Sequence, residues 1–137
     1  MFAIESTNSK GWRWISGLVA TRAEAELNVS AVPESERHFH KIVDVPIRAF
    51  PVFLIETNGF EFGGIEFVRQ RLRQIEPSDD QDTVHFNVYA FTSRFLPKVP
   101  GRDEMGGVLH WHVTNDTLTS PRAEVFEAEL ADIANDA

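Results

Sequence analysis

The chain has 137 residues, a length at which one domain with a substantial hydrophobic core is the usual arrangement. It carries 21 acidic and 13 basic residues, a formal net charge of −8, which disfavours direct binding to the phosphate backbone of nucleic acids. It has no cysteine, no signal peptide at its start and no apolar run near the ~20 residues of a membrane helix, so we expect no disulfide, no membrane partner and a cytoplasmic location.

The first part of the chain predicts a β-hairpin followed by a short helix. Residues 2–6 alternate between apolar and polar side chains, turn-forming residues follow, and residues 12–20 provide a second strand. Thr21 stands three residues before Glu24, the spacing of a capping box, so we expect a helix over residues 22–31. The apolar stripe predicted for this helix consists of Ala23, Leu27 and Ala31.

The rest of the chain predicts two further pairs of strands, each pair followed by a helix. The four strands are expected at residues 38–46, 52–57, 83–91 and 107–114. A helix is expected within residues 63–77, with an apolar face formed by Ile65, Val68, Leu72 and Ile75. The last helix is expected within residues 119–137, with Ser120 as its cap and an apolar face formed by Ala123, Phe126, Leu130 and Ile133.

This order of elements predicts the fold class. Strands that follow one another in pairs through short links favour antiparallel pairing, and helices between the pairs must bury their apolar stripes on a sheet. We therefore expect residues 1–137 to form a single α+β domain. Its antiparallel sheet of about six strands and its roughly three helices would form two layers.

Two histidines near the C-terminus are the clearest candidates for site residues. His110 and His112 are two residues apart on a predicted strand, so their side chains project from the same face. Two imidazoles at this spacing can bind one metal ion if a third ligand is supplied. The candidates for that ligand are His38, His40, His85, Asp103 and Glu104. The alternative interpretation is that the pair simply forms the polar face of a strand.

The segment before these histidines is unusually long for a loop. Residues 94–107 contain three basic and two acidic side chains and lead directly into the histidine strand. Long loops in compact domains are often functional, although a solvated hairpin loop remains the alternative interpretation. The predicted binding site comprises Arg94, Lys98, Arg102, Asp103, Glu104, His110 and His112.

Charged residues on the predicted helices allow a further interpretation. The arginines of helix 63–77 are too few for a nucleic-acid surface, and we expect them either to form a solvated face or to pair with acids of the same protein. The last helix carries five acids against one base, which predicts either a solvated face or a surface for a basic partner. The five acids are Glu124, Glu127, Glu129, Asp132 and Asp136.

Three functional hypotheses follow from these patterns. No phosphate-binding loop, nucleophile elbow or zinc-protease motif occurs, so no catalytic residue and no cofactor is predicted. The favoured hypothesis is a non-enzymatic acidic binding protein of the bacterial cytoplasm, for example an immunity-type inhibitor of a basic nuclease toxin. The alternative is a small metal-dependent enzyme or ligand-binding protein that uses His110, His112 and the loop 94–107. A third hypothesis is a homodimer formed through Trp12 and Trp14.

Overall fold

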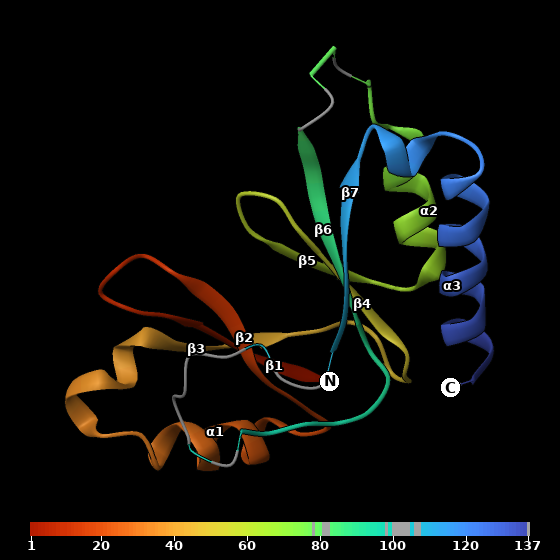
Figure 1. Cartoon of the computed structure of the whole chain (residues 1–137). Helices are drawn as coiled ribbons and strands as arrows, with labels where there is room; N and C mark the ends of the chain where they lie inside the picture. The colour runs from red at the N-terminus through yellow and green to blue at the C-terminus, as the bar shows by residue number, and fades with distance from the viewer. Residues whose placement is uncertain (78, 81–82, 98, 100–104, 106–107, 137) are drawn as a thin grey trace. The chain divides into compact units, whose positions relative to one another are not determined.

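A computed structural model describes residues 1–77, 79–80, 83–97, 99, 105 and 108–136 of the chain. The chain divides into two compact units. Unit 1 comprises Met1–Arg48 and Ser93–Gly107, and unit 2 comprises Ala49–Thr92 and Val108–Ala137. The predicted α+β class is confirmed, because the described part of the chain contains antiparallel strands and three α-helices (Figure 1). The strands form two sheets, however, rather than the one sheet expected from their order.

Unit 1 contains a three-stranded antiparallel sheet with the order β2-β1-β3. The predicted hairpin is confirmed, because β1 and β2 pair with each other through a short turn. The elements of this unit are β1 (Phe2–Thr7), β2 (Arg13–Val19), α1 (Arg22–Ser30), the 3-10 helix η1 (Glu34–Phe39) and β3 (His40–Asp44). The third strand, β3, pairs with the other edge of β1.

Helix α1 begins where the sequence predicts but buries a different face. The Thr21 hydroxyl oxygen accepts a hydrogen bond from the Glu24 amide at 3.2 Å, as an N-cap residue does. Leu27, at the centre of the predicted stripe, is 75% exposed, which makes that part of the prediction wrong. Ala25 is fully buried instead and packs with Ile4, and Val29, four residues further on, borders the same core.

The predicted strand at 38–46 begins later than expected. Glu34–Phe39 form the 3-10 helix η1, so His38 precedes the strand and His40 is its first residue. His38 and His40 therefore do not share a strand face, although the strand predicted over residues 38–46 would have placed them on one, and that part of the prediction is wrong. The cause is local, because residues 34–39 follow Pro33 in a helical turn before the chain extends.

Unit 2 contains a four-stranded antiparallel sheet with the order β5-β4-β6-β7. Its elements are β4 (Val52–Glu56), β5 (Phe60–Gly63), α2 (Ile65–Arg73), β6 (Val84–Phe91), β7 (Val108–Thr114), the 3-10 helix η2 (Asp116–Leu118) and α3 (Arg122–Asp136). The short strand β5 was not predicted, because its glycine end resembles a break before a helix. In the described part of the chain, β7 pairs with β6 alone and forms one edge of the sheet.

Helices α2 and α3 pack on the same face of this sheet (Figure 1). Their predicted apolar faces are confirmed, because Val68 of α2 and Leu130 of α3 are both fully buried. These side chains meet inward-facing residues of three strands. The buried cluster consists of Phe53, Ile55, Val68, Phe86, Val88, Ala90, Val113, Phe126, Leu130 and Ile133.

Two arginines of α2, Arg69 and Arg71, pair with acids of the same unit, which is one of the two expected arrangements. Arg69 forms ion pairs with Glu66 and with Glu127 of α3, and its Nε lies 2.8 Å from a Glu127 carboxylate oxygen. Arg71 pairs with Glu61 of β5. One of the acids on α3 is therefore already neutralised within the unit. No helix among the described residues is long and apolar enough to cross a membrane.

Candidate functional site

The face of the unit 2 sheet opposite α2 and α3 carries a set of polar side chains at matched positions. Across β6 and β7, Tyr89 is paired with His110 and Asn87 with His112. Across β4 and β6, Asn87 is paired with Glu56. Side chains alternate between the two faces of a strand, so these five project from one face while their neighbours enter the core. We call this set the histidine network.

Hydrogen bonds within the histidine network fix the orientation of Asn87. The Asn87 amide nitrogen donates to Glu56 Oε1 at 3.1 Å, because a carboxylate can only accept. The Asn87 carbonyl oxygen must then face the histidines, where His110 Nε2 lies at 3.1 Å and His112 Nδ1 at 2.5 Å. Since that oxygen accepts from both, each of these ring nitrogens carries its proton. When the rings are neutral, the lone pairs are therefore on His110 Nδ1 and His112 Nε2.

Ring contacts hold the two imidazoles in place. The ring of Tyr89 stacks on that of His110 with 4.3 Å between centroids and 11° between planes. His110 meets His112 edge to face, with centroids 4.4 Å apart. Both histidines are nevertheless exposed, so their unprotonated nitrogens are able to accept hydrogen bonds from an incoming group.

The surroundings of His110 keep its ring neutral. Burial lowers the pKa of His110 below its ordinary value, and the nearby His112 lowers it further, while Glu56 acts in the opposite direction. The ring therefore remains an acceptor at neutral pH. This state suits recognition of a donor such as a lysine or arginine side chain.

Tyr89 provides a direct test of the histidine network. Burial, together with the negative charge and hydrogen bond of Glu56, raises the pKa of Tyr89 to about 12. Because Tyr89 is the only tyrosine, its phenolate absorbance is measurable without assignment. We expect Glu56→Gln to lower this pKa towards 10 without reaching it, since burial is the largest cause. A wild-type titration midpoint near 10 would contradict this geometry.

The same shift has a consequence for stability. The folded pKa of Tyr89 lies above the ordinary value of 10.0, so the folded state holds this proton more tightly than the unfolded state. The resulting stabilisation is complete below pH 10 and is lost as the pH rises from about 10 to about 12.

A groove runs along the free edge of β7 beside α3. Its first part has a volume of about 460 Å³ and is lined by residues of both faces of β7, including His110 and Trp111, and by α3. Its second part has a volume of about 290 Å³ and is also lined by His110 and Trp111. We call the two together the β7–α3 groove. Its lining consists of Leu109, His110, Trp111, His112, Thr117, Pro121, Arg122, Val125, Phe126, Glu129, Asp132 and Ile133.

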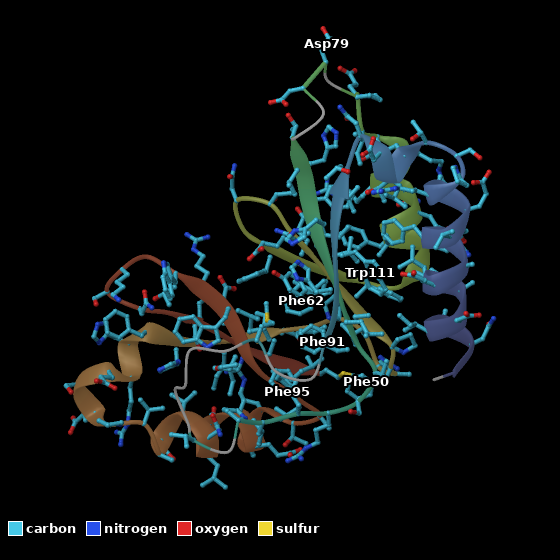
Figure 2. All side chains as sticks on the ribbon, in the orientation of Figure 1. Phe50, Phe62, Asp79, Phe91, Phe95 and Trp111 are labelled. Atoms are coloured by element: carbon cyan, nitrogen blue, oxygen red, sulfur yellow. The ribbon has the colours of Figure 1, made fainter. Side chains whose placement is uncertain are left out.

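Trp111 forms the floor of this groove. Its ring stacks on that of Phe126 with 5.7 Å between centroids and 19° between planes. The indole nitrogen donates a hydrogen bond to Glu129 at 2.5 Å, which holds that carboxylate at the rim. Figure 2 shows Trp111 between β7 and α3. Two large apolar side chains that line the groove, Leu109 and Val125, are 52% and 56% exposed.

Three of the seven members of the predicted binding site belong to the described residues. His110 and His112 lie together in unit 2, as expected from their spacing. Arg94 belongs to unit 1, where its Nε lies 2.7 Å from a carboxylate oxygen of Glu24 on α1. The other predicted members, Lys98, Arg102, Asp103 and Glu104, lie outside the described residues.

The described part of the chain provides no third ligand for a metal ion at His110 and His112. Within it, no three histidine or acidic side chains are placed to hold a metal ion. His85, one of the candidates, bonds instead through Nε2 to the Asn115 side chain at 2.6 Å. A metal site at His110 and His112 would therefore need ligands from the residues that the structure leaves undescribed.

Unit 1 contains a second polar cluster that the sequence did not predict. The Ser6 hydroxyl lies 2.6 Å from His40 Nδ1 and 2.8 Å from the Ser16 hydroxyl. This resembles a nucleophile beside a base, but Ser6 is fully buried and no substrate can reach it. Burial also lowers the pKa of His40. The cluster satisfies polar groups inside the sheet, which is a structural role.

Sequence reasoning missed three members of the histidine network. Glu56, Asn87 and Tyr89 stand on two other strands, and only the strand register brings them to His110 and His112. The alternation within residues 83–91 does place Asn87 and Tyr89 on one face. What the sequence lacks is any sign of which strands are neighbours.

Comparison of the chain with protein-family models, with curated protein sequences and with solved structures finds no match.

Proposed function

We propose that this chain is a non-enzymatic binding protein that holds a basic segment of a partner protein in the β7–α3 groove. The observation that supports it is the combination of an apolar floor with an acidic rim. Trp111 and Phe126 provide aromatic surface for an anchor residue, and Glu129 and Asp132 border it. Among the described residues, these two carboxylates are the only charged groups that line the second part of the groove, whereas the lining of the first part also includes Arg122.

The net charge of the chain also favours a basic partner. A net charge of −8 attracts basic proteins over long range and speeds their encounter with the groove. A concrete form of this function is an immunity-type inhibitor of the bacterial cytoplasm. Such a protein blocks a basic toxin, for instance a nuclease, by presenting carboxylates where the phosphates of the substrate would bind.

A defined pair of peptides tests this function. We expect a short peptide of alternating lysine and valine to bind in fluorescence polarisation, with an affinity that falls as salt is raised. The matched peptide of alternating glutamate and valine should not bind, because the rim repels it. Equal binding of both peptides, or binding of neither, would contradict the proposal.

The histidine network supports a second candidate, a ligand-binding site. Asn87 bonds His110 Nε2 and His112 Nδ1, which leaves His110 Nδ1 and His112 Nε2 to meet a small hydrogen-bond donor or a metal ion. A Zn²⁺ titration separates the two candidates. Stoichiometric binding that is lost in His112→Ala would favour the histidine site, and its absence would leave the groove as the functional region.

A further inference from the structure

We infer that the partner segment binds as an added β-strand, paired through its backbone with the free edge of β7. This inference rests on the proposed function, since it specifies how the basic segment is held. It commits to an extended basic segment as the occupant. Three features of the protein support it: the backbone groups of β7, the side chain that caps the end of β7 and the charges beside that strand.

Thr117 shows which backbone groups of β7 point away from β6. Its hydroxyl donates to the His112 carbonyl oxygen at 3.3 Å and accepts from the Thr114 amide at 3.1 Å. These two groups therefore face the free edge. Backbone groups of alternate residues point the same way along a strand, so the amide and carbonyl of His110 face that edge as well.

The strand register supports this assignment. Residues whose backbone groups face away from the neighbour form the closely spaced, non-hydrogen-bonded pairs of an antiparallel ladder. His110 opposite Tyr89 and His112 opposite Asn87 are pairs of this kind, consistent with their side-chain contacts. Leu109 and Trp111 then carry the backbone bonds to β6.

Thr117 also marks the end of the edge that is available. Its hydroxyl takes the place that a pairing strand would take at His112 and Thr114. The part of β7 that remains for an added strand is Val108–His112, beside which the β7–α3 groove runs. In the described part of the chain, no second strand pairs there.

Side chains of an added strand would meet different surroundings on its two faces. Those that point towards α3 meet Trp111, Val125 and the carboxylates of Glu129 and Asp132. Those that point the other way lie on the side of the His110 and His112 rings, where Asn87 leaves His110 Nδ1 and His112 Nε2 without a bond from its own side chain. In the second part of the groove, an acidic side chain on either face of the added strand would meet no basic side chain among the described lining residues. A segment of basic and apolar residues therefore fits best.

A second copy of the chain is a less suitable occupant. Pairing of β7 with another β7 would bring together two chains that each carry a net charge of −8. It would also bring the Glu129 and Asp132 carboxylates of two grooves to one interface, where Arg122 is the one basic side chain in the described lining of each groove. The charge of the molecule therefore favours a different, basic partner.

Amide hydrogen exchange tests the strand addition on the wild-type protein. With the lysine–valine peptide bound, we expect exchange at the His110 amide to slow about tenfold or more. The Leu109 and Trp111 amides, which pair with β6, serve as internal controls and should change little. Binding of the peptide without protection of His110 would overturn the strand addition and leave the proposed function intact. Absence of peptide binding would overturn both.

A pair of variants tests the same point by affinity. His110→Ala removes the imidazole and keeps the outward amide, whereas His110→Pro removes both and leaves the β6 ladder intact. We expect the proline variant to bind the peptide about tenfold more weakly than the alanine variant. Equal affinities in two folded variants would overturn the inference. If exchange at the His110 amide slows with rising protein concentration when no peptide is present, the edge of β7 pairs with a second copy of the chain. That result would also overturn the inference.

Discussion

Replacing Trp111 by alanine is expected to weaken binding of the lysine–valine peptide about thirtyfold, because aromatic anchors at the centre of a site typically contribute about 2 kcal/mol or more. The change removes the floor of the groove and the partner ring of Phe126. It also releases Glu129, which the indole nitrogen holds at the rim. Fluorescence polarisation with the purified variant measures the loss directly.

Trp111→Phe is the matched control for this prediction. Phenylalanine keeps an aromatic ring against Phe126 but lacks the indole donor to Glu129. We expect an intermediate affinity, because apolar contact is retained while the carboxylate becomes mobile. Unchanged peptide binding in a folded Trp111→Ala variant would show that the Trp111 ring does not contact the bound peptide.

Removing the two carboxylates at the rim is expected to weaken peptide binding about tenfold at low salt, since exposed ion pairs contribute up to about 1 kcal/mol each. The double variant Glu129→Gln/Asp132→Asn preserves shape, and a glutamine oxygen can still accept from Trp111. The loss should shrink as salt is raised, because both carboxylates are exposed. Titrations at two salt concentrations measure it.

A second double variant separates local from overall charge. Glu76→Gln/Asp79→Asn removes the same two charges from exposed positions of unit 2 that do not line the groove, and Figure 2 marks Asp79 at the turn before β6. We expect it to bind the peptide nearly as well as wild type. If both double variants lose affinity equally, net charge rather than the groove determines binding.

Local patterns in the sequence predicted much of unit 2. Alternation placed His110 and His112 on one face, and spacing identified the buried face of α3 through Phe126 and Leu130. Such features depend on residues close together in the chain, where periodicity is decisive. In α1 the pattern failed, because several small or apolar residues offered more than one stripe, and Leu27 proved exposed.

The arrangement of strands could not be predicted in the same way. The expected neighbours β3 and β4 belong to different sheets, with β3 paired to β1 and β4 paired to β5 and β6. Register between strands depends on contacts that are distant in sequence. For this reason the sequence identified the histidines but not Glu56 and Asn87, and the acids of α3 but not the groove beside β7.

An NMR titration of the wild-type protein with the lysine–valine peptide tests the central claim most directly. The indole N–H of Trp111 is an isolated probe at the floor of the groove, because the chain has only three tryptophans. We expect its signal to shift on binding, together with the signals of the amides of Val108–His112, Val125 and Glu129. Peptide binding that shifts signals elsewhere and leaves Trp111 unchanged would contradict the account.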